Sequence, residues 1–269
     1  MLPAAMRPHV AALYAFARVA DDIADEGEAP PGERQARLRA WQERLHDAAR
    51  DARGLRTLDR DDLILAAVSH SIRSLDLPIA LFDDLVSAFG QDTTTTRYAS
   101  WCDVLDYCRR SANPIGRLVL RIAGYRDETL DRSSDGLCSA LQLTNFWQDF
   151  GRDWRIGRLY VPTEVALACG ASEDDLARGR MGPAWAQAIA ACAAFTRTLF
   201  DGGRTVCDGV QGRLRVELRF TWLGGARILE RVERGRFDLL DRRPALSLAD
   251  VPLLIWRGAR WRASESRQR

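Results

Sequence analysis

The chain has 269 residues, 46% of them hydrophobic and 28% charged, a balance typical of a globular protein that can bury a sizeable core. Its 39 basic and 37 acidic residues leave a net charge of only +2, which argues against the basic stripe of a nucleic-acid-binding protein. The chain contains arginine but no lysine, so chemistry that depends on a lysine Schiff base or a phosphate-binding lysine is excluded.

Helical periodicity dominates the chain, and alternating strand patterns are rare. The first predicted helix extends from Pro8 to about Asp25, before Gly27 and the Pro30–Pro31 pair. Further helices are predicted over about 33–52, 60–75, 78–90, 100–123, 128–155, 161–168, 172–178, 182–210, 213–234 and 248–256. No linker-like run or repeat divides the sequence. We therefore expect an all-α fold, a helical bundle in a single domain over residues 1–269, with roughly the last 8 residues disordered.

The cysteines and the chain termini indicate a cellular location. The six cysteines include no CxxC pair, so a zinc site is not expected and buried free thiols are. We find no signal-length apolar run at the N-terminus and no segment suited to cross a bilayer, and we expect a cytoplasmic protein. The segment 253–262 mixes apolar residues, tryptophan and arginine, so it either packs on the domain or contacts the inner membrane peripherally. The oligomeric state is not indicated.

The first predicted helix has an acidic face. Five residues with the spacing i, i+4, i+7, i+8 and i+11 share this face: Tyr14, Arg18, Asp21, Asp22 and Asp25. Apolar residues lie on or beside the same stripe, so the face is predicted to point inward. Three carboxylates there are costly unless a cation neutralises them, which a divalent metal ion would do. The alternative is a solvated acidic helix end.

A second polar face lies on the helix predicted over 128–155. Its members have the spacing i, i+3, i+7 and i+11: Gln142, Asn145, Asp149 and Asp153. Aromatic residues interleave with them, so this helix is predicted to be largely buried. A buried amide and two buried carboxylates make a weak structural element but a good oxygen-rich face for a metal. Ordinary capping or surface pairing is the alternative.

Together the two faces indicate a ligand. Two helices with oxygen donors on their inner faces can hold a cluster of hard cations between them, and Mg²⁺ favours a few carboxylates, water and phosphate oxygens. We therefore expect a diphosphate that is bound through about two or three bridging Mg²⁺ ions. Arg18 and Arg158 are close in sequence to these donors and are candidates to pair with phosphate oxygens.

These motifs resemble those of the squalene/phytoene synthase family. Tyr14-x-x-x-Arg18-x-x-Asp21-Asp22-x-x-Asp25 is similar to its first aspartate-rich motif. The second polar face, followed by Gly157-Arg158-Leu159-Tyr160-Val161-Pro162, is similar to its second. Residues 107–116 resemble the central helix that lines the hydrocarbon tunnel. The resemblance spans most of the chain in the same order, and it implies a single bundle of helices around a deep cavity and magnesium-dependent chemistry on C15 or C20 prenyl diphosphates.

Within the family, the segments 108–114, 145–149 and 241–244 resemble the branch that makes hydroxysqualene for bacterial hopanoids. This resemblance implies that presqualene diphosphate loses diphosphate and that water captures the rearranged cation, with no NADPH. The implied metal ligands are Asp21, Asp22, Asp25, Asn145, Asp149 and Asp153. The implied substrate-binding residues are Tyr14, Arg18, Arg158, Phe16, Tyr107 and Trp147. The candidates for holding the water are Tyr160, Gln142 and Asn113. Ordinary core packing is the alternative role of each aromatic residue.

Two other interpretations stay open. Other synthases of the family make presqualene diphosphate, dehydrosqualene or phytoene, with farnesyl diphosphate as one such substrate. A non-catalytic homologue would serve as an assembly or binding protein, but it would be expected to lose metal carboxylates that are all present here. Family members usually have a further N-terminal segment, with a serine and an aromatic residue that help to bind diphosphate. This chain begins at the Leu2–Pro3 pair that normally follows it, so we expect a shortened N-terminus or a start codon placed too late.

Overall fold

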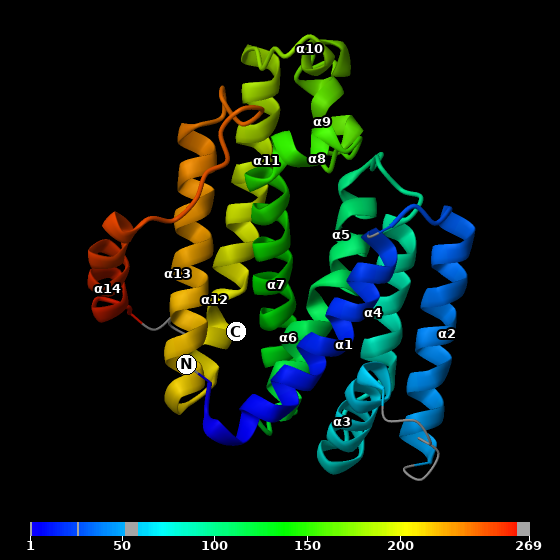
Figure 1. Cartoon of the computed structure of the whole chain (residues 1–269). Coiled ribbons are helices and arrows are strands. Elements are labelled where there is room, and N and C mark those ends of the chain that lie inside the picture. Colours follow the sequence, from blue (N-terminus) through cyan, green and yellow to red (C-terminus); the bar gives the residue numbers. More distant parts are fainter. Residues whose placement is uncertain (1, 26, 52–58, 263–269) are drawn as a thin grey trace. The chain divides into compact units, whose positions relative to one another are not determined.

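The computed structural model describes residues 2–25, 27–51 and 59–262, and most of them are helical (Figure 1). Within these ranges there is no β-strand, only an isolated parallel bridge between Arg97 and Leu159. The prediction of an all-α fold is confirmed. None of the helices in these ranges has the length and hydropathy that a membrane span requires. The predicted disorder at the C-terminal end concerns residues 263–269, which lie outside the described residues.

The chain divides into two compact units, each built from two stretches of sequence. Unit 1 comprises Met1–Thr95 and Arg109–Asp131, and unit 2 comprises Thr96–Cys108 and Arg132–Arg269. Two helices, α5 (Trp101–Ser111) and α7 (Glu128–Gln148), contribute residues to both units. The single domain expected from the sequence stays a prediction.

Unit 1 is built around its first long helix. Its helical elements are η1 (Ala4–Met6), α1 (Arg7–Asp25), α2 (Pro31–Arg50), α3 (Arg60–Leu75), α4 (Ile79–Asp92) and α6 (Asn113–Ile122). Helix α1 packs against α2, α3 and α4. At the centre, the fully buried ring of Phe16 stacks on Trp41 and meets Phe82 edge to face, with both centroid distances 5.4 Å. Offset and edge-to-face pairs of this kind stabilise a core beyond the area they bury.

Unit 2 holds most of the remaining helices. They are α7, α8 (Phe150–Arg155), α9 (Thr163–Ala168), α10 (Glu173–Ala177), α11 (Pro183–Gly202), α12 (Arg204–Gly209), α13 (Gly212–Arg234), η2 (Leu248–Asp250) and α14 (Val251–Ala259). Helix α11 packs against α9 and α13, and α13 packs against α12 and α14. Trp147, Trp185 and Phe200 are the largest fully buried side chains of this unit.

Three segments predicted as continuous helices are each two helices, so the prediction is wrong at three points. The first break, at Ala112, precedes Pro114, which has no N–H to donate and clashes with the preceding turn. The second, at Asp149, has the local backbone angles φ −93° and ψ 7°. At the third, Gly203, a Cβ atom would lie 2.5 Å from the backbone nitrogen of Leu137 on α7, so only glycine permits this close approach.

Candidate active site

The acidic face of α1 lies in unit 1, on the accessible side of the helix. Tyr14 is 69% exposed and Asp25 is also exposed, whereas the buried residues of α1 include Phe16, Ala20 and Ala24 on the opposite side. The prediction that this face points into the protein interior is therefore wrong. The apolar ridge of α1 is a separate stripe, and it is this ridge that packs on α2, α3 and α4.

Arg18 neutralises two carboxylates of this face. Its guanidinium nitrogens lie 2.7 Å from Asp21 Oδ2 and 2.7 Å from Asp22 Oδ1. All three side chains are partly exposed, and the pairs span three and four residues of one helix. The helix alone therefore brings Arg18 to these aspartates, as expected for side chains one turn apart.

The second polar face lies in unit 2 and continues through the helix break. The Asp149 amide donates to the Asn145 carbonyl at 2.8 Å, and the Asp153 amide donates to the Asp149 carbonyl at 2.9 Å. These hydrogen bonds keep successive members one turn apart, so Asn145, Asp149 and Asp153 stack along one side.

The surroundings of this stripe are apolar. The buried residues next to it on α7 and at the start of α8 include the apolar Leu143, Phe146, Trp147 and Phe150, with the polar Thr144 and Gln148 among them. The predicted burial of this helix is confirmed. The polar residues themselves are less buried than expected, because Asn145 is exposed and Gln142, Asp149 and Asp153 are half-buried. The stripe is the open side of an otherwise buried helix, where donor atoms are accessible to a ligand.

Arg243, which was not among the predicted site residues, pairs with Asp149. Its Nε and Nη2 atoms donate to the two carboxylate oxygens, the second at 3.1 Å, and this hydrogen bonding raises the pKa of Arg243. A bidentate contact of this kind is geometrically specific. The segment 241–244 was singled out in the sequence only for its resemblance to relatives, and nothing in its pattern indicated a contact with Asp149.

The loop that carries Arg243 is fixed to the break between α7 and α8. Gln148 donates to the carbonyl of Pro244 and Arg155 to that of Leu240, both at 2.6 Å. Gly151 lies so close to the loop that a Cβ atom there would be 2.2 Å from the Leu240 carbonyl oxygen. The position of Arg243 therefore depends on tertiary contacts over almost a hundred residues of sequence.

Aromatic side chains gather beside this stripe in unit 2. Tyr160 stacks on Phe146, with a centroid distance of 3.7 Å and an interplanar angle of 4°. Tyr107 lies 5.9 Å from Phe146 and 6.2 Å from Tyr160. Tyr98 stacks on Tyr160 at 5.6 Å and is also buried. These four residues form an aromatic cluster that contains three phenol groups.

Tyr98 was missed in the sequence because the segment around it has no helical or motif signal. The tertiary structure holds it in place through backbone contacts. The Leu159 amide donates to the Thr96 carbonyl and the Thr163 amide donates to the Tyr98 carbonyl, both at 2.9 Å. Two short segments far apart in sequence thus place Tyr98 against Tyr160.

A small, closely packed recess in unit 2, with no room for a water molecule, brings several predicted site residues together. It is lined by Asp153, Arg158 and Tyr160, together with Phe146 and Trp147. The Arg158 amide donates to the Asp153 carbonyl at 2.8 Å, which fixes the turn after α8. A carboxylate, a guanidinium group and a phenol therefore lie together beside two further aromatic side chains.

The other candidates occupy different environments. Trp147 is fully buried and donates its indole N–H to Thr196 at 2.9 Å, so its surroundings are those of a core residue, as are those of Phe16 in unit 1. Asn113 is buried at the start of α6, also in unit 1, whereas Gln142 is half-buried in unit 2. Core packing, the alternative considered for each aromatic residue, describes Phe16 and Trp147.

The donor atoms fit magnesium in kind. Among the described residues, no three histidine, cysteine, aspartate or glutamate side chains form a ready metal cluster. Magnesium usually takes only one or two protein carboxylates and completes its shell with water and phosphate oxygens, so it does not need such a cluster. Asn145, Asp149 and Asp153 offer hard oxygen donors on one accessible face.

Comparison with known proteins agrees with this arrangement. The "Squalene/phytoene synthase" family model matches residues 1–250. The hydroxysqualene synthase of Sinorhizobium fredii is 36% identical over 218 residues, which cover 79% of this chain and 70% of the relative. That of Zymomonas mobilis is 36% identical over 195 residues, covering 72% of this chain and 62% of the relative.

Solved structures show the same fold. The squalene synthase HpnC from Alicyclobacillus acidocaldarius has a TM-score of 0.80 and 36% identity, covering 88% of this chain and 86% of that one. A dehydrosqualene synthase has a TM-score of 0.81 at 22% identity, covering 96% and 88%, a likeness of fold alone. The family model spans nearly the whole chain, and the motif residues of the chain lie on two accessible helix faces. This chain therefore belongs to the squalene/phytoene synthase family.

Proposed function

We propose that this chain is a magnesium-dependent hydroxysqualene synthase, a lyase that converts presqualene diphosphate and water to hydroxysqualene and diphosphate. One observation carries the proposal: the accessible stripe of Asn145, Asp149 and Asp153 lies beside Arg158 and the aromatic side chains of Phe146 and Tyr160. Such a site combines donors for a bound diphosphate with apolar surface for a hydrocarbon. The similarity to two hydroxysqualene synthases supports this choice within the family.

The proposed reaction breaks one carbon–oxygen bond and forms another. The bond from carbon to diphosphate breaks, and its electron pair leaves with the diphosphate. The resulting cation rearranges, a water oxygen bonds to carbon, and one proton is released. Bound magnesium would supply positive charge that stabilises the leaving diphosphate. Arg158, which is half-buried next to Asp153 and Tyr160, would add charge-assisted hydrogen bonds to phosphate oxygens.

The aromatic cluster would stabilise the cation without reacting with it. The ring of Tyr107, and the face of Phe146 that Tyr160 does not cover, would attract positive charge but add no nucleophile. Tyr160 has a hydroxyl group and lies close to Asp153 and Arg158, so we favour it as the residue that holds the water. Gln142, one turn before Asn145 on the same stripe, and Asn113 are the other candidates.

The α1 face would supply the second set of oxygen donors. Asp21, Asp22 and Asp25 are accessible on unit 1, and Tyr14 and Arg18 share their side of the helix. Arg18 already binds two carboxylates, so a diphosphate oxygen would offer it a further anionic partner.

A product assay tests the proposal. The full chain would be incubated with presqualene diphosphate and Mg²⁺, with and without NADPH, and the extracts analysed by mass spectrometry. We expect hydroxysqualene in both cases and none when EDTA removes the metal. Parallel incubations would replace presqualene diphosphate by farnesyl diphosphate or by a C20 prenyl diphosphate. Presqualene diphosphate, dehydrosqualene or phytoene formed in these incubations would instead identify another synthase of the family. No product from any of these substrates would favour an assembly or binding role.

A further inference from the structure

The C-terminal helix of unit 2 turns its apolar side chains outward. Leu248 in η2 is 89% exposed, and Ile255 and Trp256 in α14 are 57% and 52% exposed. Together with the exposed Val251 they have the spacing i, i+3, i+7 and i+8, which is one side of a helix. No residue of α14 is buried. A helix on the surface of a domain normally packs its apolar stripe inward. Here Leu253 and Leu254 are half-buried, and a second apolar stripe is left on the outer side.

Polar contacts at its N-terminal end hold α14 in this orientation. Asp250 is buried and accepts hydrogen bonds from Arg227 Nε at 2.9 Å and Arg231 Nη2 at 2.6 Å, both on α13. Ser247 completes a capping box with Asp250. The backbone N–H of Ser247, and then Arg227, hold the pKa of Asp250 well below its usual range. The start of α14 is therefore attached by its polar side.

Further contacts fix the middle and the end of the helix. Arg257 donates to Glu230 on α13 at 2.6 Å, and the indole of Trp261 donates to Asp208 at 2.9 Å. Gly258 lies against Phe220, where a Cβ atom would be 3.2 Å from the ring. Because these inward contacts are specific, the outward position of the apolar stripe is a feature of the fold.

The same surface is positively charged. Between Val251 and Arg262 the chain has three arginines and no acidic residue. The guanidinium group of Arg260 lies 4.6 Å from the ring centroid of Trp256, and Arg260 and Arg262 are both exposed. Arginine over tryptophan at the edge of an apolar stripe is the composition of a helix that lies in a membrane interface.

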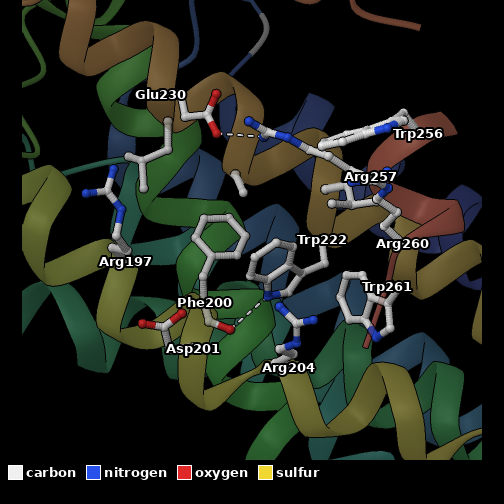
Figure 2. Close-up of a pocket in the computed structure, with 13 residues that line it drawn as sticks. Arg197, Phe200, Asp201, Arg204, Trp222, Glu230, Trp256, Arg257, Arg260 and Trp261 are labelled. Carbon is white, nitrogen blue, oxygen red and sulfur yellow. Dashed lines mark hydrogen bonds and ion pairs between the residues drawn. The ribbon is translucent and has the colours of Figure 1, made fainter. Parts of the chain in front are cut away.

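A cavity of about 520 Å³ lies beside this helix, between α11, α13 and α14, and Trp256 and Arg260 are among the residues that line it (Figure 2). In it the guanidinium group of Arg204 lies 4.1 Å from the ring centroid of Trp261 and 5.3 Å from that of Trp222. Of the two acidic side chains that line the cavity, Glu230 is bound by Arg257 and Arg227, and Asp201 lies near the other end. The cavity extends the basic, tryptophan-rich character of the surface inward.

We propose that the α14 surface, which we define as Leu248, Val251, Ile255, Trp256, Arg260 and Arg262, docks on an anionic lipid bilayer. The apolar side chains would enter the headgroup region while the two arginines meet lipid phosphates. A second copy of the chain fits less well, because a two-fold contact through the same patch would place like-charged arginines together. This proposal concerns unit 2 alone and does not rest on the proposed catalytic activity.

Vesicle flotation with the full chain tests the proposal. We expect the protein to float with vesicles of equal parts phosphatidylcholine and phosphatidylglycerol at least tenfold more than with phosphatidylcholine alone, and to be released by high salt. Ile255→Asp should abolish this binding. Leu167→Asp is the matched control, since Leu167 is an apolar residue of unit 2 that is 69% exposed on α9, and it should bind like the parent.

A charge reversal completes the experiment. Arg260→Glu should lower binding to anionic vesicles several-fold, whereas Arg180→Glu, an exposed control in unit 2, should not. Circular dichroism would verify that each variant is folded. Failure of the parent chain to float with anionic vesicles, or equal flotation of Ile255→Asp, would overturn the proposal. A dimer in sedimentation that Ile255→Asp dissociates, without vesicle binding, would assign the surface to a protein interface instead.

Discussion

The two carboxylate-bearing faces differ in where their counter-charges come from. On α1, Arg18 binds Asp21 and Asp22 within two turns of one helix. On the stripe of α7 and α8, Asp149 is bound by Arg243, which is 94 residues away in sequence. The α1 pairs are partly exposed, whereas the Asp149 side chain is only 14% exposed. The first face is therefore set by local geometry and the second by the fold of unit 2.

This difference has an energetic consequence. Exposed pairs within one helix contribute about 0.3–0.5 kcal/mol each, so the α1 face adds little to stability. The second face is part of a packed arrangement in which a glycine, two side-chain-to-carbonyl hydrogen bonds and a guanidinium contact meet. We therefore expect changes at α1 to affect function with little effect on folding, and changes at α7–α8 to affect both.

The largest expected effect comes from removing the central carboxylate of the second face. Asp149→Ala should lower kcat by about 10²–10³-fold, the range typical of losing one electrostatic contact to developing charge. The helices should persist. Steady-state kinetics and circular dichroism measure both effects. Asp174→Ala, at an exposed carboxylate on α10, is the control that should keep the parent rate. A parent-like rate for Asp149→Ala would remove this face from the site.

The next effect tests the attachment of the loop. Gly151→Ala should cost about 1–3 kcal/mol or more of unfolding free energy, because the new methyl group would collide with the Leu240 carbonyl. Urea unfolding measures this cost. Gly90→Ala in α4 is the matched control: a Cβ atom there meets nothing within 4 Å, and alanine should stabilise the helix by about 0.5–1 kcal/mol. If Gly151→Ala were as stable as the parent, the loop that carries Arg243 would be able to move away from the new methyl group without a loss of stability.

The stability of the protein should depend on alkaline pH through thiol groups of unit 2, because all six cysteines lie in that unit. Burial raises the pKa of the Cys108 and Cys207 thiols to about 12 and also raises that of Cys192. The unfolded chain loses these protons near pH 9, as free thiols do, so above that pH it binds fewer protons than the folded chain.

These thiols should therefore leave stability unchanged between pH 7 and about pH 9 and lower it above that by up to about 1.4 kcal/mol per pH unit for each buried thiol, until the folded thiols ionise. Urea unfolding between pH 7 and pH 11 measures this slope. A variant with Cys108→Ala, Cys192→Ala and Cys207→Ala should have a flatter profile. An unchanged slope would mean that other groups cause the alkaline loss.

The smallest expected effect comes from removing Arg243 or Arg18, the arginines that pair with the aspartates of the two faces. Arg243→Gln should lower the Mg²⁺ concentration for half-maximal activity by about fivefold or less, since a partly exposed ion pair is worth up to about 1 kcal/mol. Arg18→Gln should do so less, because its pairs are more exposed. Arg152→Gln is the control. The Arg152 guanidinium is exposed and lies 3.7 Å from Asp149 Oδ1, so this change should leave the Mg²⁺ requirement as in the parent. A higher Mg²⁺ requirement for Arg243→Gln would mean that Arg243 supports the ligand.

Much of the secondary structure and of the candidate site could be predicted from local spacing. The limits of α1, α3 and α13 follow from apolar periodicity and from the glycines and prolines near their ends. The sharing of one side by Asn145, Asp149 and Asp153 follows from helical geometry and holds even through the break at Asp149. The order of the motifs also predicted the family, which the family model confirms.

Other features depended on contacts between distant segments. Tyr98 stands against Tyr160 only because residues 96–98 bond to 159–163, and Arg243 reaches Asp149 only because its loop packs on Gly151. The outward side of α14 depends on Asp250 and Arg257 being bound to α13. Periodicity along the chain determines which residues share a face, because backbone geometry is local. It does not determine what that face meets, because partners far apart in sequence are selected by packing and by the pairing of buried polar groups.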